Sequence, residues 1–164
     1  MKKEVLFSSN KDEWSTPEKF FHVLDEEFHF DLDPCASHEN HKCNKYYTVE
    51  DDGLRQDWGG QTCFVNPPYS QNKKWVQKCY EESLKPNTTV VLLVPARTDV
   101  NWFHEYVFGK ADVRLVRGRL RFGGSENSAP FPSMVCVFGA NKEIYRPEET
   151  MCVSRMNRES GDAK

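Results

Sequence analysis

One stretch of the sequence decides the fold: Thr62-Cys63-Phe64-Val65-Asn66-Pro67-Pro68-Tyr69. Its first four residues are apolar or β-branched, which predicts a short buried strand. The two prolines that follow lack backbone N–H groups and have a fixed φ, so the chain can neither continue a sheet nor begin a helix there. The stretch is therefore a strand that ends in a rigid loop, with Asn66 at the carboxyl end of the strand.

Strands and helices alternate around this loop. Apolar spacing predicts helices over residues 17–27, 73–84 and about 102–107, with Ser15 or Thr16 as a cap before Pro17. Strands are predicted over residues 28–33, 88–94, 113–122 and 133–138. This order is typical of an α/β fold with a mainly parallel sheet, and the last two strands predict an antiparallel hairpin at its edge.

The chain has the length and composition of one globular domain. Its 164 residues are 38% apolar and 29% charged, which allows one sizeable core and excludes a disordered protein. Apolar content falls toward the end of the sequence. We therefore expect one domain over residues 1–139 and a flexible polar tail over residues 140–164.

The N-terminal sequence bears on location. Only three apolar residues follow Met1-Lys2-Lys3-Glu4, so the sequence predicts neither a signal peptide nor a membrane span. We expect a cytoplasmic protein with no membrane partner. The six cysteines should then be reduced thiols that mostly pack in the core.

The distribution of positive charge is more informative than the net charge of −3. Binding to nucleic-acid phosphates requires local Lys and Arg, and five basic residues lie between positions 110 and 121 against one acid, Asp112. Arg117, Arg119 and Arg121 alternate, so in a strand they would share one face. This pattern predicts a phosphate-binding patch, while a solvated edge strand would produce the same alternation.

Other polar residues lie beside the predicted strands. Asp33 ends the strand over residues 28–33, and Asp57 precedes the strand that leads to Asn66. In open α/β sheets, ligands bind outside the carboxyl ends of the strands, which makes Asp33 and Asn66 candidates for ligand binding.

Four residues offer an alternative, a zinc-binding module: Cys35, His38, His41 and Cys43. Their spacing is tighter than that of paired zinc knuckles. We therefore expect no metal site.

The sequence also resembles a known family. Asn66-Pro67-Pro68-Tyr69 is similar to the (D/N/S)PP(Y/F/W) signature of amino-group methyltransferases, and the wider pattern resembles the phage-type Dam DNA N6-adenine methyltransferases over roughly residues 14–138. The supporting blocks are Trp14-Ser15-Thr16-Pro17, Phe30-Asp31-Leu32-Asp33-Pro34-Cys35-Ala36-Ser37, Asp52-Gly53-Leu54, Asp57-Trp58, Leu93-Val94-Pro95-Ala96-Arg97-Thr98-Asp99 and Gly118-Arg119-Leu120-Arg121-Phe122. The resemblance implies a reduced Rossmann-like fold and an enzyme that uses S-adenosylmethionine to methylate N6 of adenine in DNA. If a phage encodes the protein, it would act in the host cytoplasm.

By this resemblance the catalytic residues are Asn66, Pro67, Pro68 and Tyr69. An exocyclic amine is a poor nucleophile because its lone pair is delocalised into the ring. Asn66 Oδ1 and the Pro67 carbonyl are the candidate acceptors that would favour a tetrahedral nitrogen. Tyr69 would stack on an adenine extruded from the duplex.

The resemblance also implies a set of contacts to S-adenosylmethionine: Trp14, Thr16, Pro17, Asp33, Pro34, Cys35, Asp52 and Asp57. Asp33 would lie near the methionine part, Asp51 or Asp52 near the ribose, and Asp57 near the adenine amino group. The family's usual Gly-rich motif is absent, so Ala36 and Ser37 must permit the approach of the cofactor to the backbone.

For the DNA substrate the expected contacts are Lys73, Lys74, Arg119, Arg121 and Phe122. The chain leaves no room for a large recognition domain, so short loops or a second subunit would set the DNA sequence preference. The sequence is compatible with a homodimer and does not decide the oligomeric state. The catalytic loop alone fixes only amino methylation. An enzyme acting on RNA or on a protein glutamine, and a non-catalytic nucleic-acid-binding module, are the alternatives.

Overall fold

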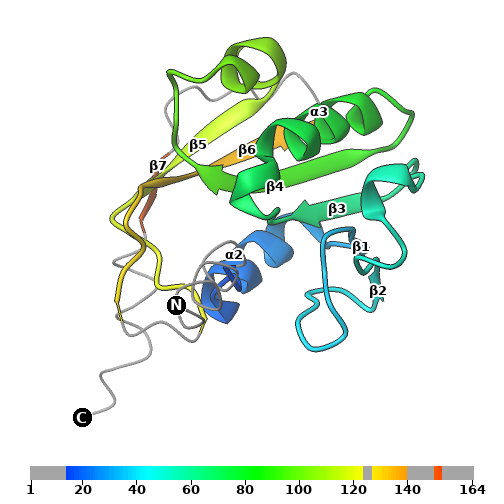
Figure 1. The fold of residues 1–164 in the computed structure, drawn as a ribbon, viewed down its shortest axis with the longest axis horizontal. Coiled ribbons are helices and arrows are strands. Elements are labelled where there is room, and N and C mark those ends of the chain that lie inside the picture. Colours follow the sequence, from blue (N-terminus) through cyan, green and yellow to red (C-terminus); the bar gives the residue numbers. More distant parts are fainter. Residues whose placement is uncertain (1–13, 124–126, 140–149, 153–164) are drawn as a thin grey trace, which may run out of the picture.

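The protein is described by a computed structural model over residues 14–123, 127–139 and 150–152. Its centre is one seven-stranded sheet with the strand order β2-β1-β3-β4-β6-β5-β7 (Figure 1). The strands are β1 Leu32–Asp33, β2 Lys45–Tyr46, β3 Thr62–Val65, β4 Thr89–Pro95, β5 Asp112–Arg117, β6 Ser133–Phe138 and β7 Thr150–Cys152. The helices are α2 Glu18–Phe28 and α3 Asn72–Ser83, with the short segments η1 Gly53–Arg55, η2 Tyr69–Gln71 and η3 Phe103–Val107.

The sheet combines parallel and antiparallel pairs. β1 pairs in parallel with both β2 and β3, and β3 pairs in parallel with β4. β6 then runs antiparallel to β4 and to β5. The predicted mixed α/β architecture and its antiparallel hairpin are confirmed. The hairpin does not form the edge, because β7 adds in parallel to the outer side of β5.

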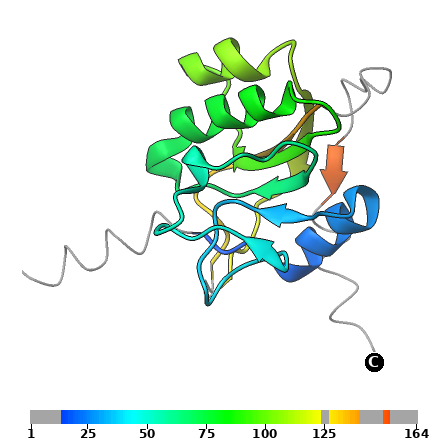
Figure 2. The same cartoon turned by 90° about the vertical axis from the view of Figure 1, so that its right-hand side faces the viewer.

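The core has two layers, one on each face of the sheet. Side chains of β4 alternate between them: Val90, Leu92 and Val94 pack with α3 and η3, while Val91 and Leu93 pack with α2. Figure 2 shows α3 and η3 covering one face and α2 the other. The uninterrupted apolar run of β4 is thus explained by burial on both sides, as in a central strand.

The sequence located most elements to within a residue or two. The helix predicted over residues 17–27 is α2, the strand that leads into the catalytic loop is β3, and the helix after that loop is α3. No helix in the described part of the chain is long and apolar enough to cross a membrane.

Five details of the fold differ from the predictions. The strand predicted over residues 28–33 is only β1, Leu32–Asp33, because α2 continues to Phe28 and His29 ends it with a φ of 56°. β5 ends at Arg117, because Gly118 has a φ of 82° and turns the chain out of the strand. The strand β2 was not predicted, and η3 is a π-helical segment rather than an α-helix. β7 lies beyond residue 139, so the sheet extends into the predicted tail, whose residues 140–149 and 153–164 lie outside the described residues.

Arg114 is the one member of the predicted basic run that the structure turns inward. Its guanidinium makes two hydrogen bonds of 2.7 Å to the Glu27 carboxylate at the end of α2 and one of 3.3 Å to Asp112. The residue is only 8% exposed. Arg114 therefore connects α2 to the sheet, and the prediction that it belongs to a phosphate-binding patch is wrong.

We expect Arg114→Met to lower the free energy of unfolding by about 1–3 kcal/mol, because the Asp112 carboxylate would keep its burial and lose its charged partner. Urea denaturation gives the value. The matched control is Arg117→Met, an exposed residue of the same strand, which should change stability by less than about 0.5 kcal/mol. Equal effects of the two substitutions would contradict the structural role of Arg114.

Candidate active site

A cavity of about 330 Å³ lies at the point where the strand order reverses. β1 has β2 on one side and β3 on the other, and such a switch point is where open α/β sheets bind ligands. Asp33 ends β1 and Asn66 follows β3, and both side chains line the cavity. Its volume is in the range of small-molecule sites.

Asn66 has a fixed orientation in the cavity wall. Its Nδ2 group donates to the Trp14 carbonyl oxygen and, at 2.9 Å, to the Thr16 hydroxyl. Because a carbonyl can only accept, this pair of bonds determines which end of the amide faces the N-terminal segment. Asn66 Oδ1 is buried and has no partner among the described residues. The amide therefore presents an unused acceptor.

Thr16 does not cap α2, contrary to the prediction. Pro17 stands at the N-cap of the helix without a side-chain hydrogen bond, and the Ser15 hydroxyl bonds to Asn40 instead. The Thr16 hydroxyl is used to accept from Asn66. A threonine in the usual sequence position of a helix cap thus bonds instead to a residue fifty positions away in the sequence.

An aromatic cluster adjoins Asn66, and we define it as Trp14, Tyr69, Phe122 and Phe131. The Tyr69 and Phe131 rings pack edge to face with their centroids 5.0 Å apart. The Trp14 ring centroid lies 5.4 Å from that of Phe122 and 5.7 Å from that of Phe131. The Tyr69 hydroxyl is buried without a partner among the described residues, and burial raises its pKa. The tyrosine is thus neutral and lies among rings that offer flat apolar surfaces.

Asp33 supplies a buried carboxylate to the cavity. It is 5% exposed and accepts backbone N–H groups from Cys35 at 3.3 Å and from Lys42 at 2.9 Å. Burial raises its pKa to about 6, and the two hydrogen bonds oppose this shift. A carboxyl group held at that value can change its charge near neutral pH.

The two aspartates considered for the ribose have different roles. Asp51 accepts from the backbone N–H and the hydroxyl of Thr48 at 2.8 and 3.0 Å, and these bonds lower its pKa. Asp52 lines the cavity, and its Oδ2 atom lies 3.3 Å from Nε of Arg55. Asp51 therefore holds the loop, and Asp52 is the acid that faces the cavity.

Gly53 permits the close packing of the cavity floor. A Cβ atom at this position would lie 2.0 Å from the Pro34 carbonyl oxygen and 3.2 Å from the Trp75 ring. Its own carbonyl accepts from the Trp58 indole at 3.0 Å. Only a glycine at position 53 allows η1 to lie this close to the segment that follows β1.

Trp75 is a cavity residue that the sequence did not reveal. Helical spacing placed it on the buried face of α3, which is correct, and it also lines the cavity. Its indole stacks on that of Trp58 with the ring centroids 6.2 Å apart. Its Nε1–H is buried without a partner among the described residues. Lys42 and Thr48 line the cavity as well, and no motif singles them out.

The structure brings together most of the residues predicted for the cofactor. Lining the cavity are Trp14, Thr16, Asp33, Pro34, Cys35, Asp52, Asn66 and Pro68. Asp57 does not line it: this residue is exposed at the opposite end of β3, where it accepts from Lys85 at 2.7 Å. Pro17, Pro67 and Tyr69 do not line the cavity, although each is next in sequence to a residue that does.

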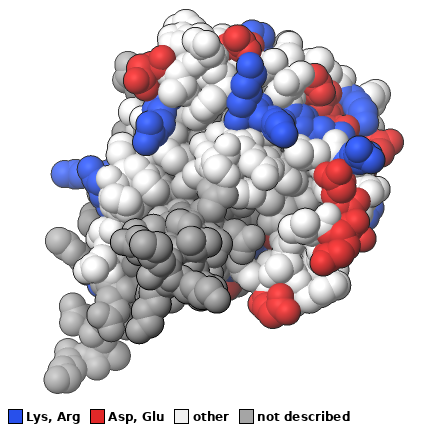
Figure 3. Space-filling model, in the orientation of Figure 1, with Lys and Arg blue, Asp and Glu red and all other residues white. Residues whose placement is uncertain are grey.

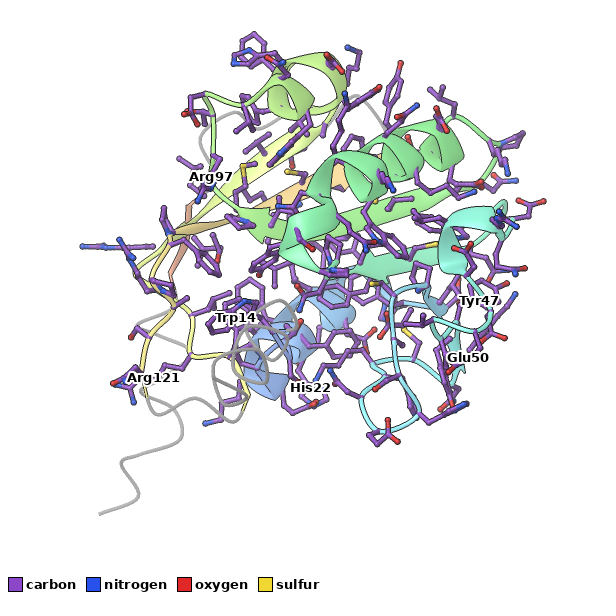
Figure 4. All side chains as sticks on the ribbon, in the orientation of Figure 1. Trp14, His22, Tyr47, Glu50, Arg97 and Arg121 are labelled. Atoms are coloured by element: carbon purple, nitrogen blue, oxygen red, sulfur yellow. The ribbon has the colours of Figure 1, made fainter. Side chains whose placement is uncertain are left out.

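The residues predicted to contact DNA lie outside the cavity. Lys73 and Lys74 are exposed on the first turn of α3, and Arg119 and Arg121 are exposed beyond β5. Phe122 is buried against Trp14. Figure 4 shows Arg121 on the same side of the molecule as Trp14, with its side chain pointing outward.

The structure does not group Cys35, His38, His41 and Cys43, the residues of the alternative zinc module, as ligands of one metal ion. Within the described part of the chain, no group of three or more His, Cys, Asp or Glu residues is arranged to hold a metal ion. His41 stacks on Tyr46 at 4.0 Å, and His38 Nδ1 lies 3.0 Å from the Tyr46 hydroxyl. These rings hold the loop before β2.

Asn66 lines a cavity of small-molecule size on a proline-fixed loop, and its amide oxygen has no partner among the described residues. This arrangement is expected of an amino-group methyltransferase. The comparisons with known proteins agree. The model of the family described as "DNA N-6-adenine-methyltransferase (Dam)" matches residues 3–161. The chain belongs to this family.

Two phage proteins are among its relatives. A DNA N-6-adenine-methyltransferase of Haemophilus phage HP1 is 36% identical over 129 residues, which are 77% of this chain and 75% of that protein. A DNA N-6-adenine-methyltransferase of Escherichia phage T1 is 36% identical over 112 residues, which are 67% of this chain and 47% of that protein. The family as a whole implies the use of S-adenosylmethionine.

The raised pKa of Asp33 predicts a characteristic pH dependence of stability. Between pH 3.8 and about 6 the folded protein holds a proton on Asp33 that the unfolded chain has lost, so raising the pH through this window lowers stability. The total loss is up to about 3 kcal/mol. We expect Asp33→Asn to remove this decline in ligand-free protein, as measured by urea denaturation between pH 4 and 7. Glu39→Gln, at an exposed position of the same loop, is the control. Parallel curves for Asp33→Asn and the wild type would refute the assignment.

Proposed function

We propose that this protein binds S-adenosylmethionine in the cavity and transfers its methyl group to N6 of an adenine turned out of duplex DNA. The observation that carries this proposal is the orientation of Asn66, a residue that lines the cavity. Two acceptors fix its NH₂ group, and its Oδ1 atom is a buried acceptor without a partner among the described residues. When bound, S-adenosylmethionine supplies an electrophilic methyl group on a sulfonium.

The residues of the catalytic loop act on the amine. Asn66 Oδ1 and the Pro67 carbonyl accept the two N–H groups of N6, which draws the nitrogen lone pair out of the ring system. Pro67 and Pro68 fix the backbone, so these acceptors need no reorganisation at the moment of transfer. The N6 proton that the product loses passes to solvent.

The aromatic cluster provides the surface for the target base. Tyr69 lies three residues after Asn66, and its ring is covered by Phe131 in this structure. An adenine on the Tyr69 ring would replace that contact by stacking, which offsets part of the unstacking that base flipping costs. A neutral Tyr69 hydroxyl adds no charge to this surface.

The cavity fits the proposed cofactor in size and chemistry. It offers the buried Asp33 carboxylate and the Asp52 carboxylate at the loop after β2. Two of its lining residues also carry a buried polar atom that has no partner in the described part of the chain, Asn66 Oδ1 and Trp75 Nε1. We propose contacts from Trp14, Thr16, Asp33, Pro34, Cys35 and Asp52, and we leave Asp57 out because it lies at the opposite end of β3. The strand order supports a reduced Rossmann-like fold.

We propose that DNA lies across the side that carries Arg119 and Arg121. These residues alternate with Leu120 and Phe122, which are buried. The arginine side chains therefore lie on the outer surface of this segment. Figure 3 shows further basic side chains over α3 and acidic ones at the β1–β2 edge, which would repel phosphates. Lys73 and Lys74 on α3 are the second set of candidates.

The direct test is methyl transfer in parallel to duplex DNA, RNA and protein, followed by mass spectrometry of the digested DNA. The proposal requires N6-methyladenine in DNA. Methylation of RNA or of a protein glutamine alone would give the chain another substrate, and absence of transfer together with absence of cofactor binding would make it a binding module.

Replacing the catalytic amide should abolish most of the activity. We expect Asn66→Ala to lower the methylation rate roughly 100- to 1000-fold, because one preorganised acceptor is lost. Single-turnover assays at saturating cofactor measure this effect. Asn44→Ala, at an exposed loop position, is the control. Near-normal turnover by Asn66→Ala would disprove the assignment.

Removing two positive charges should weaken DNA binding and its salt dependence. For Arg119 and Arg121 changed together to Ala, the slope of log K against log salt should fall by up to about 2. Binding titrations at several salt concentrations give the slope. The charge-matched control changes Lys45 and Arg55, exposed near the opposite edge of the sheet, and should leave the slope unchanged. The same slope in both variants would place DNA elsewhere.

A further inference from the structure

The loop that follows β4 presents an unpaired guanidinium. Arg97 is exposed, and its side chain makes no ion pair or hydrogen bond with another residue in the described part of the chain. The nearest acid in the sequence, Asp99, is exposed as well and does not pair with it. Arg97 does not line the cavity, and the DNA contacts proposed above do not include it. Its charge is therefore available to a ligand.

The register of the sheet places Arg97 at the edge that carries the catalytic loop. β3 and β4 are parallel neighbours, and Val65 pairs with Leu92. Three residues further along each segment lie Pro68, in the catalytic loop, and Pro95, the last residue of β4. Arg97 stands two residues beyond Pro95. It thus belongs to the edge of the sheet at which the target base is handled.

The backbone around Arg97 is fixed on both sides. The N–H of Ala96 donates to the Pro132 carbonyl at 2.8 Å, which ties the loop to the start of β6. The His104 ring donates from Nε2 to the Thr98 carbonyl at 2.7 Å, which ties it to η3. A charged side chain on a fixed backbone loses only its own rotamer freedom on binding, so the loop suits the binding of an anion.

Arg97 lies on the same side of the molecule as the arginines proposed for DNA. Figure 4 shows Arg97 and Arg121 both on the left, with Trp14 between them in that view. Trp14 holds the Asn66 amide through its carbonyl. Positive charge therefore stands on either side of the catalytic residue in this view.

We infer that Arg97 binds a phosphate of the target strand next to the flipped adenine, on the side of that nucleotide away from Arg119 and Arg121. This inference rests on the proposed function and adds a site to it. A base leaves the duplex by rotation of its nucleotide about the backbone, so the phosphates on both sides of it need to be held. A guanidinium binds a phosphate through two parallel N–H···O bonds and so fixes its orientation as well as its position.

Arg97 then acts at a different step from the other two arginines. Arg119 and Arg121 attract the duplex, and their loss weakens binding. Arg97 holds the nucleotide in its extruded position, so its loss also slows methyl transfer when DNA is saturating. This difference distinguishes Arg97 from a charge that only attracts DNA.

The test combines a substitution with a neutral phosphate. Sequencing of methylated DNA first identifies the target adenine, and duplexes then carry one uncharged methylphosphonate at each linkage within two nucleotides of it. With S-adenosylhomocysteine present, so that no transfer occurs, the wild type should lose affinity roughly tenfold at one linkage next to the adenine. Arg97→Ala should bind the unmodified duplex that weakly and lose nothing further at this linkage. Arg97→Lys should recover part of the affinity.

A second measurement separates holding the extruded base from attraction. We expect Arg97→Ala to lower the single-turnover rate at saturating DNA roughly tenfold. The loss should be smaller on a duplex whose target adenine has no partner base, because that base leaves the stack more easily. Lys45→Ala, at an exposed position near the opposite edge of the sheet, is the control and should match the wild type on every duplex.

Three results would overturn the inference. Arg97→Ala with the affinity of the wild type and its sensitivity at every linkage would leave Arg97 a solvated charge. Loss of sensitivity only at a linkage that does not adjoin the adenine would place the contact elsewhere, and equal rate losses on the two duplexes would reduce it to attraction. Absence of N6-methyladenine from DNA treated with the wild type would instead refute the proposed function. Thermal unfolding of each variant establishes that folded proteins are compared.

Discussion

The hydrogen bonds of the Asn66 amide join the strand that ends in the catalytic loop to the segment that begins α2. Trp14 contributes its carbonyl and Thr16 its hydroxyl, so one amide fixes the relative position of two segments fifty residues apart. Losing either bond would leave a buried donor unpaired, which costs about 1–3 kcal/mol. The free Oδ1, the Trp14 ring in the aromatic cluster and the start of α2 all depend on this contact.

Local rules of sequence were sufficient for the elements that carry the site. The loop of two prolines after β3 and the continuous apolar run of β4 are each determined by neighbouring residues, and the structure agrees with both. The start of α2 was predicted to within one residue, although its cap was not. Because Asp33 and Asn66 end adjacent strands, their meeting at one cavity also followed from the sheet rule alone.

The remaining features depend on contacts between distant residues. Thr16 has the sequence of a helix cap, but the competing partner Asn66 is invisible in its neighbourhood. Asp57 was placed by resemblance, and its pairing with Lys85 across the far end of the sheet could not be read from spacing. Arg114 is out of phase with Arg117, Arg119 and Arg121, so in a strand its side chain points to the other face, and its partner Glu27 lies on another element.

Buried polar atoms without a partner are concentrated near the catalytic loop. Among the described residues six side chains carry such an atom, and four of these lie between positions 66 and 75: Asn66, Tyr69, Asn72 and Trp75. Folding gives no reason to group unpaired donors and acceptors in one short stretch, since each lowers the stability of the ligand-free protein. A ligand does give a reason, because any of these atoms that it pairs regains its hydrogen bond, and binding then stabilises the fold by mass action. The raised pKa of Asp33 belongs to the same pattern, as a carboxylate that is costly to bury alone becomes favourable beside a cation. The stability of the empty protein and its affinity for a ligand are therefore opposed at the same side chains, which is the expected signature of a site shaped for binding rather than for folding.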